Sequence, residues 1–196
     1  MSLHIAILAL QGAFAEHRKM LESLGAEVFE IRQKKDLTLK CDALILPGGE
    51  STTQGKLLRE LELFEPLKKR IADGLPVLAT CAGTILLAKQ LADDPVTHFA
   101  TMPIVVRRNA YGRQLSSFYA DSNFSGIDQN LPMPFIRAPQ IVDYDAEVEL
   151  LASVGQKPVA VRYGNQVAMT FHPEITGNPA IHRCFLEKTV IPARKS

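Results

Sequence analysis

Cys81, His172 and Glu174 are the residues of this chain whose types and surroundings best fit nucleophilic catalysis. An apolar run at 76–80 leads directly into Cys81, and an apolar helical pattern follows it, which predicts a sharp strand-to-helix turn with the thiol at its tip. Free N–H groups and partial positive charge in the first helical turn favour a thiolate there. The alternative for this stretch alone is a buried cysteine that acts as a small hydrophobe.

A cysteine nucleophile needs a base within reach and an acceptor that orients the base. His172 and Glu174 flank Pro173 just after the apolar run at 167–171, and the proline ends the strand, so the carboxylate can accept from the imidazole. Taken alone, His172 is also consistent with a structural loop histidine. The remaining histidines have no such context and are interpreted as surface or packing residues: His4, His17, His98 and His182.

Two further stretches contain groups suited to binding. The loop after the strand-like run at 42–46 carries Gly48 and Gly49, whose N–H groups can turn toward a site as an oxyanion hole requires, with the N–H of Ala82 as a second donor. This loop lacks the spacing of a P-loop, which disfavours nucleotide hydrolysis. The basic stretch 107–113 can bind a carboxylate through a guanidinium fork, or it is a solvated hairpin tip.

The elements that must position these groups alternate between strand and helix through residue 91. Short β-like runs occupy 103–169, some of them antiparallel, and a closing helix is expected from Asn178 to Lys188. The predicted fold is therefore α/β, a single domain built on a doubly wound, mixed and mostly parallel sheet flanked by helices. Functional groups gather at the carboxyl ends of strands in such sheets, where Cys81, Gln11, the 47–51 loop and His172 all fall.

Composition bounds the class of protein. The chain has 196 residues, 46% hydrophobic and 22% charged, with a formal net charge of +1, which predicts one domain over 1–196 and favours neither nucleic-acid nor membrane binding. Three widely spaced cysteines lack metal-ligand spacing, no run approaches membrane-spanning length, and the start has no secretory pattern. We expect a cytoplasmic protein with no metal site and no cofactor.

Six stretches carry a resemblance that spans nearly the whole chain. They are LALQGAF (8–14), LPGGESTT (46–53), TCAG (80–83), RNAYGRQ (108–114), FIRAP (135–139) and FHPE (171–174). Together with the order of Cys81, His172 and Glu174 they resemble class I glutamine amidotransferases of the triad type, and among these the glutaminase subunit of the two-component pyridoxal 5′-phosphate synthase. The sequence departs from that pattern at Ala79, where the elbow has glycine, and at Tyr111, where phenylalanine is common.

The resemblance implies a flavodoxin-like amidotransferase fold and hydrolysis of L-glutamine to glutamate and ammonia. Cys81 would form a γ-glutamyl thioester, His172 would transfer the proton, and Glu174 would orient His172. The positions that match the family's glutamine-binding residues are Gly49, Glu50, Ser51, Arg108, Ile136 and Arg137, while Gln11, Gly48 and Ala82 match oxyanion or partner-facing positions. Ammonia would pass to a separate synthase chain in a hetero-oligomeric complex, and the glutaminase is expected to be slow until that chain docks.

Three other functions remain open at this point. The glutaminase of another amidotransferase shares the same three residues, but it does not explain LALQGAF or RNAYGRQ. A cysteine peptidase on a related fold would have to bind an extended peptide. A catalytically silent binding module would not need the complete set of nucleophile, base and acid.

Overall fold

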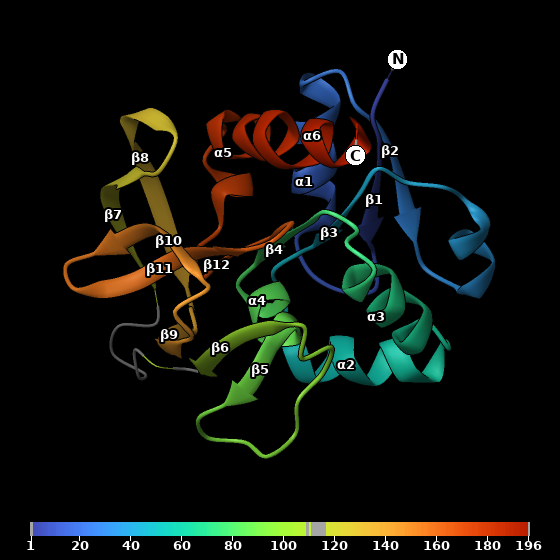
Figure 1. Cartoon of the computed structure of the whole chain (residues 1–196), viewed down its shortest axis with the longest axis horizontal. Coiled ribbons are helices and arrows are strands. Elements are labelled where there is room, and N and C mark those ends of the chain that lie inside the picture. Colours follow the sequence, from blue (N-terminus) through green and yellow to red (C-terminus); the bar gives the residue numbers. More distant parts are fainter. Residues whose placement is uncertain (1, 109, 111–116, 196) are drawn as a thin grey trace.

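The computed structural model describes residues 2–108, 110 and 117–195 (Figure 1). Its strands are β1 (His4–Leu8), β2 (Glu27–Ile31), β3 (Ala43–Leu46), β4 (Val77–Thr80), β5 (Ala88–Leu91), β6 (Met102–Arg107), β7 (Ser117–Phe124), β8 (Ile127–Ile136), β9 (Gln140–Tyr144), β10 (Glu149–Val154), β11 (Lys157–Tyr163) and β12 (Gln166–Met169). Its α-helices are α1 (Phe14–Ser23), α2 (Ser51–Glu60), α3 (Phe64–Ala72), α4 (Ala82–Leu87), α5 (Ala180–Phe185) and α6 (Ile191–Lys195). Short 3-10 segments are η1 (Lys34–Thr38) and η2 (Pro173–Ile175), and η3 (Leu186–Val190) is π-helical.

The central sheet of the described residues has seven strands in the order β10-β11-β12-β4-β3-β1-β2. The strands from β12 to β2 pair in parallel, whereas β11 runs antiparallel to both of its neighbours. Two smaller sheets accompany it, β5-β6-β9 and the hairpin β7-β8. The predicted α/β class with a mixed, mostly parallel sheet is confirmed.

The central strands are apolar because both of their faces are buried. In β1, Ala6 and Leu8 point into one core cluster while Ile5 and Ile7 point into the other, and all four are fully buried. Successive side chains of a strand point to opposite faces, so a strand covered on both sides reads as a continuous apolar run. This two-sided burial fixes the sheet in the middle of the molecule.

Different elements cover the two faces. One core cluster contains apolar side chains of α2, α3, α4, β5 and β6, and the other contains those of α1, α5, η3 and the β7-β8 hairpin. Figure 1 shows α1 and α5 on one side of the sheet and α2, α3 and α4 on the other. The carboxyl ends of β4 and β12 lie side by side, because the two strands pair in parallel with Met169 opposite Thr80.

Several element boundaries differ from the predicted ones. The helix after Cys81 ends at Leu87, where the chain turns into β5 instead of remaining helical to residue 91. The strands expected between 103 and 169 are present, and several of them pair antiparallel; β10, β11 and β12 join the central sheet, whereas β6 and β9 pair in one of the smaller sheets and β7 and β8 form the other. The closing helix begins at Ala180, and after one π-helical segment it continues past Lys188 to Lys195.

Candidate active site

Cys81 occupies a strained turn between β4 and α4. Its backbone has φ 47° and ψ −102°, a conformation with positive φ that disfavours any side chain. The turn also demands small neighbours, because a Cβ on Gly83 would lie 2.1 Å from the carbonyl oxygen of Leu46. Ala79, which stands where the family has glycine, is fully buried in β4 and does not prevent the turn. The predicted elbow is therefore present, with the thiol at its tip.

His172 and Glu174 meet just beyond the neighbouring strand. The chain leaves β12 and turns into η2 at Pro173, which brings Nδ1 of His172 to 2.7 Å from Oε1 of Glu174. The N–H of His172 donates to the carbonyl of Pro134 at 2.9 Å, which ties this turn to β8. Both side chains are buried. The imidazole thus has the carboxylate partner that sequence analysis expected for it.

Gly48 lies against both His172 and Cys81. A Cβ built on Gly48 would lie 2.3 Å from Cε1 of His172 and 3.3 Å from Cβ of Cys81. Sγ of Cys81 in turn lies 3.9 Å from the carbonyl oxygen of Ile136. The structure therefore brings together Cys81, His172, Glu174 and the 47–51 loop at one sheet edge.

The charges of His172 and Glu174 depend on one another. Burial lowers the pKa of His172, but its hydrogen bonds with Cys81 and Glu174 outweigh burial and raise the pKa to about 10. Burial likewise opposes ionisation of Glu174, yet the neighbouring His17 and His172 hold the pKa of the carboxyl below its usual value. At neutral pH the pair is therefore an imidazolium and a carboxylate in a site shielded from water.

The 47–51 loop is fastened to the start of α1. The N–H of Ala13 donates to the carbonyl of Gly48 at 3.0 Å, and the N–H of Glu50 donates to Oε1 of Gln11 at 2.6 Å. The N–H of Gly48 donates to Oγ1 of Thr80 at 2.9 Å. In this structure the hydroxyl of Thr80 takes this N–H, so the oxyanion role of Gly48 stays a prediction. Ala82 stands at the first position of α4, where backbone N–H groups have no partner within the helix.

The expected glutamine-binding positions lie on both sides of this loop. Glu50 caps α2, accepting from the N–H groups of Thr52 and Thr53, and these hydrogen bonds lower its pKa although burial opposes the shift. Arg108 reaches the same helix end, donating to Oγ1 of Thr52 at 3.3 Å and to Asp94 at 2.7 Å.

The other expected positions occupy the loop itself and the far side of Cys81. Gly49 and Ser51 belong to the loop, whereas Ile136 ends β8 and Arg137, with φ 45°, follows it. In the rest of the predicted basic hairpin, Ala110 is described, whereas residues 109 and 111–113 lie outside the described residues.

Two buried histidines make contacts that their sequence context did not predict. His17 and His182 are buried, as their interpretation as packing residues allows, but they also form polar contacts behind the triad carboxylate. Nδ1 of His17 lies 2.9 Å from Nε2 of His182, and Nε2 of His17 lies 3.5 Å from Oε2 of Glu174. The two histidines are 165 residues apart, so no local pattern links them. In the described part of the chain, no group of three or more His, Cys, Asp or Glu side chains could hold a metal ion.

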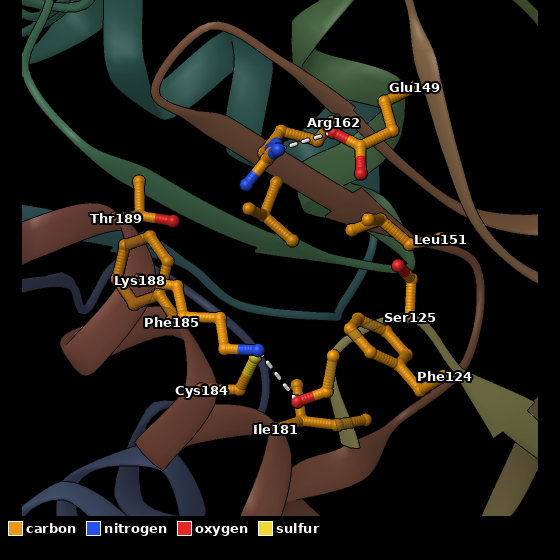
Figure 2. Close-up of a pocket in the computed structure, with 12 residues that line it drawn as sticks. Phe124, Ser125, Glu149, Leu151, Arg162, Ile181, Cys184, Phe185, Lys188 and Thr189 are labelled. Atoms are coloured by element: carbon orange, nitrogen blue, oxygen red, sulfur yellow. Dashed lines mark hydrogen bonds and ion pairs between the residues drawn. The ribbon is translucent and has the colours of Figure 1, made fainter. Parts of the chain in front are cut away.

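A cavity of about 170 Å³ lies elsewhere in the fold, between the β7-β8 turn, β10, β11 and α5 (Figure 2). Figure 2 shows Arg162 paired with Glu149 in its wall, and Nζ of Lys188 donates to the carbonyl of Gly126 at 2.9 Å. None of the triad residues lines it. We therefore locate the chemistry at the sheet edge and not in this cavity.

An α/β sheet with a cysteine elbow at one strand end, and a His-Glu pair at the end of the next strand, defines the triad-type glutamine amidotransferases. The profile of the SNO glutamine amidotransferase family matches residues 7–191, and the chain belongs to this family. No described helix is long and apolar enough to cross a membrane.

Curated relatives share about half of their residues with this chain. The protein named pyridoxal 5′-phosphate synthase subunit PdxT of Desulfitobacterium hafniense (strain DSM 10664 / DCB-2) is 55% identical over 185 residues, which cover 94% of this chain and 92% of that protein. The PdxT of Haemophilus influenzae (strain PittEE) is 51% identical, covering 93% and 96%.

Solved structures agree with the sequence relatives. A crystal structure described as a glutamine amidotransferase matches with a TM-score of 0.88 and 44% identity, over 93% of this chain and 97% of that one. A protein of Thermoplasma acidophilum described as a putative GMP synthase subunit matches with a TM-score of 0.71 at 18% identity, which shows the shared fold alone.

Proposed function

We propose that this chain is the glutaminase subunit of a pyridoxal 5′-phosphate synthase, a single domain that hydrolyses L-glutamine and delivers ammonia to a separate synthase subunit. The observation that carries the proposal is the arrangement of Cys81, His172 and Glu174 at one sheet edge, in a chain about half identical to proteins named PdxT. These names favour pyridoxal phosphate synthesis over the other amidotransferase reactions.

The three residues act in a fixed order. The sulfur of Cys81 attacks the side-chain amide carbon of glutamine, and the protonated imidazole of His172 gives its proton to the amide nitrogen, so that ammonia leaves and a γ-glutamyl thioester forms. Neutral His172 then takes a proton from water, the hydroxide attacks the thioester carbon, and the sulfur leaves as glutamate forms. Glu174 accepts from Nδ1 throughout and stabilises the imidazolium.

The residues around the loop are proposed to hold the substrate. Gly49, Glu50, Ser51 and Arg108 on one side, and Ile136 and Arg137 on the other, form the glutamine site. The N–H of Ala82 supports the developing oxyanion. Gln11, whose side chain is bonded to the loop, is proposed to face the synthase subunit. The complex is hetero-oligomeric and needs neither nucleic acid nor a membrane, and the three unpaired cysteines favour the cytoplasm as its location.

The engagement of Gly48 by Thr80 and Ala13 supports a slow glutaminase in the free subunit. Ammonia release from glutamine, measured with and without the synthase subunit, tests both the glutaminase activity and its dependence on the synthase. We expect low activity alone, a marked increase with the synthase, and complete loss in Cys81→Ser. A Cys81→Ser protein that keeps nearly wild-type activity would remove Cys81 from the nucleophile role.

A further inference from the structure

His17 and His182 form a buried pair directly behind the acid of the triad. His17 comes from α1 and His182 from α5, and neither side chain is exposed to solvent. Their rings are joined by one hydrogen bond, Nδ1 of His17 to Nε2 of His182 at 2.9 Å. The opposite nitrogen of His17 lies 3.2 Å from Oγ1 of Thr80 and 3.5 Å from Oε2 of Glu174. The pair therefore extends the triad inward into the core.

Both rings are neutral at physiological pH. Burial lowers the pKa of His17, an effect that Glu174 and Glu16 oppose and that His172 reinforces. Burial, together with His17, lowers the pKa of His182 well below its usual value. A neutral imidazole carries a single proton on one of its two nitrogens. The hydrogen bond between the rings holds one proton, so the pair has two possible arrangements.

In the first arrangement, His17 carries its proton on Nδ1 and donates to His182. Its bare Nε2 then faces the carboxylate of Glu174, whose Oε2 is buried and has no hydrogen-bond donor. His182 would carry its own proton on Nδ1, which is buried and has no partner either. A buried N–H without an acceptor and a lone pair facing a carboxylate are both costly.

In the second arrangement, His182 donates from Nε2 to His17, and His17 carries its proton on Nε2. That proton faces both Oε2 of Glu174 and Oγ1 of Thr80. The remaining cost is one unpartnered acceptor, Nδ1 of His182. This arrangement removes the unpaired N–H and the repulsion, so it is the one that the contacts favour.

We propose that His17 is a positioning residue for the triad, with His182 fixing its Nε2–H tautomer so that this N–H holds the second carboxylate oxygen of Glu174. The inference rests on the proposed glutaminase function. Oε1 of Glu174 is taken by His172, and His17 restrains the carboxylate from its other side. Because this N–H donor is neutral, the negative charge of Glu174 remains available to stabilise the His172 imidazolium.

The same nitrogen also connects the acid to the glycine loop. Oγ1 of Thr80, which faces Nε2 of His17, accepts the N–H of Gly48 at 2.9 Å. The ring of His17 therefore contacts both Glu174, which pairs with His172, and Thr80, which holds the Gly48 loop. No residue of this connection is exposed to solvent by more than a small fraction, so water does not replace the contacts.

The tautomer is tested directly on the wild-type protein. Selective ¹⁵N labelling of histidine gives five ring systems, and the His17→Gln and His182→Gln variants assign two of them. We expect both rings to be neutral at about pH 7 and above, each with its proton on Nε2. A proton on Nδ1 of His17, or titration of either ring near its ordinary value, overturns the proposal.

The kinetic test compares two replacements of His17 in the complex with the synthase subunit. His17→Asn keeps an amide toward His182 but removes the donor facing Glu174, whereas His17→Gln returns an amide nitrogen near the Nε2 position. We expect His17→Asn to lower kcat by about 10- to 100-fold with KM within about twofold, because the residue does not touch the substrate. The acid limb of kcat/KM should move to higher pH, because ionised Glu174 has lost a donor.

His17→Gln should recover most of kcat and restore the acid limb, and His4→Asn, which alters an exposed histidine on β1, is the matched control. Equal losses in both His17 variants, or an unchanged kcat and acid limb in His17→Asn, would show that His17 serves packing alone. A wild-type complex that releases no ammonia from glutamine overturns the proposed function and the positioning role with it. If His17→Asn does not fold, the ring tautomers of the wild-type protein decide.

Discussion

The imidazole of His172 is bonded to the carboxylate of Glu174 through Nδ1 and Oε1 at 2.7 Å, although only Pro173 separates the two residues. The bond forms because the chain turns into η2 at the proline. The base and its acid are thus paired by a local turn, while the nucleophile arrives from another strand.

This pairing predicts the effect of Glu174→Gln. An amide cannot stabilise the imidazolium that forms when ammonia leaves, so kcat for glutamine hydrolysis should fall by about 100-fold or more with little change in KM. Steady-state kinetics in the complex measure the change. Glu22→Gln, which removes an exposed carboxylate of α1, is the control and should keep wild-type kinetics. A Glu174→Gln enzyme with wild-type kcat would show that the carboxylate is dispensable.

The raised pKa of His172 predicts how stability depends on pH. The folded protein binds this proton more tightly than the unfolded chain, with a pKa of about 10 against 6.5. Its contribution to stability is therefore complete below about pH 6.5 and disappears as pH rises toward 10. Urea denaturation at about pH 7 and about pH 9.5 should show a larger loss in the wild type than in His172→Gln. Equal losses would mean that the pair is not charged.

Gly48 has no room for a side chain. Its Cβ would lie 2.3 Å from Cε1 of His172, so Gly48→Ala must displace the imidazole and should lower kcat by about 100-fold. Gly25→Ala is a matched control, because Gly25 has φ +82° and nothing within 4 Å of an added Cβ. It should cost about 1 kcal/mol of unfolding free energy and leave kcat unchanged. Loss of activity in both variants would point to general destabilisation.

The backbone of Cys81 stores strain that glycine would relieve. Cys81→Ala keeps the unfavourable φ of 47°, whereas Cys81→Gly adopts it freely. Both variants should be inactive, and Cys81→Gly should unfold with a free energy about 1 kcal/mol higher than that of Cys81→Ala, even after the larger chain entropy of glycine is subtracted. Urea denaturation of the two proteins measures the difference. A less stable Cys81→Gly would refute strain at this turn.

The parts of the site that follow local rules were predictable from the sequence. The apolar run before Cys81 predicts a buried strand that ends in a turn, and the proline after His172 predicts the end of another strand. Because β4 and β12 are buried and pair in parallel, both strand ends lie at one edge of the sheet. The length of α4 was not predictable in this way. In the stretch 88–91 only Ala88 and Leu91 are apolar, a spacing that also fits a helix, yet the stretch forms β5 with those two end residues buried.

The contacts behind the triad had no local signal at all. A histidine on the inward face of α1 and another on that of α5 each fit ordinary packing, and only the tertiary fold brings His17 and His182 within hydrogen-bond distance. The orientation of the Gly48 peptide was likewise unpredictable, because the hydroxyl that takes its N–H belongs to Thr80 on another strand. Cys81, His172 and Glu174 were thus predictable as candidate reacting groups, whereas the side chains that contact them from other elements were not.

The parallel pairing of β4 with β12 has a consequence for redesigning the enzyme. The N–H of Cys81 donates to the carbonyl of Met169 at 2.8 Å, so the nucleophile and the strand that delivers the base are spaced by the backbone ladder, about 4.8 Å between neighbours. The separation of the two strand ends is thus fixed by the interior of the sheet. Changes aimed at accepting a different amide are therefore better made outside these two strands, at proposed substrate-binding positions such as Arg108 and Arg137.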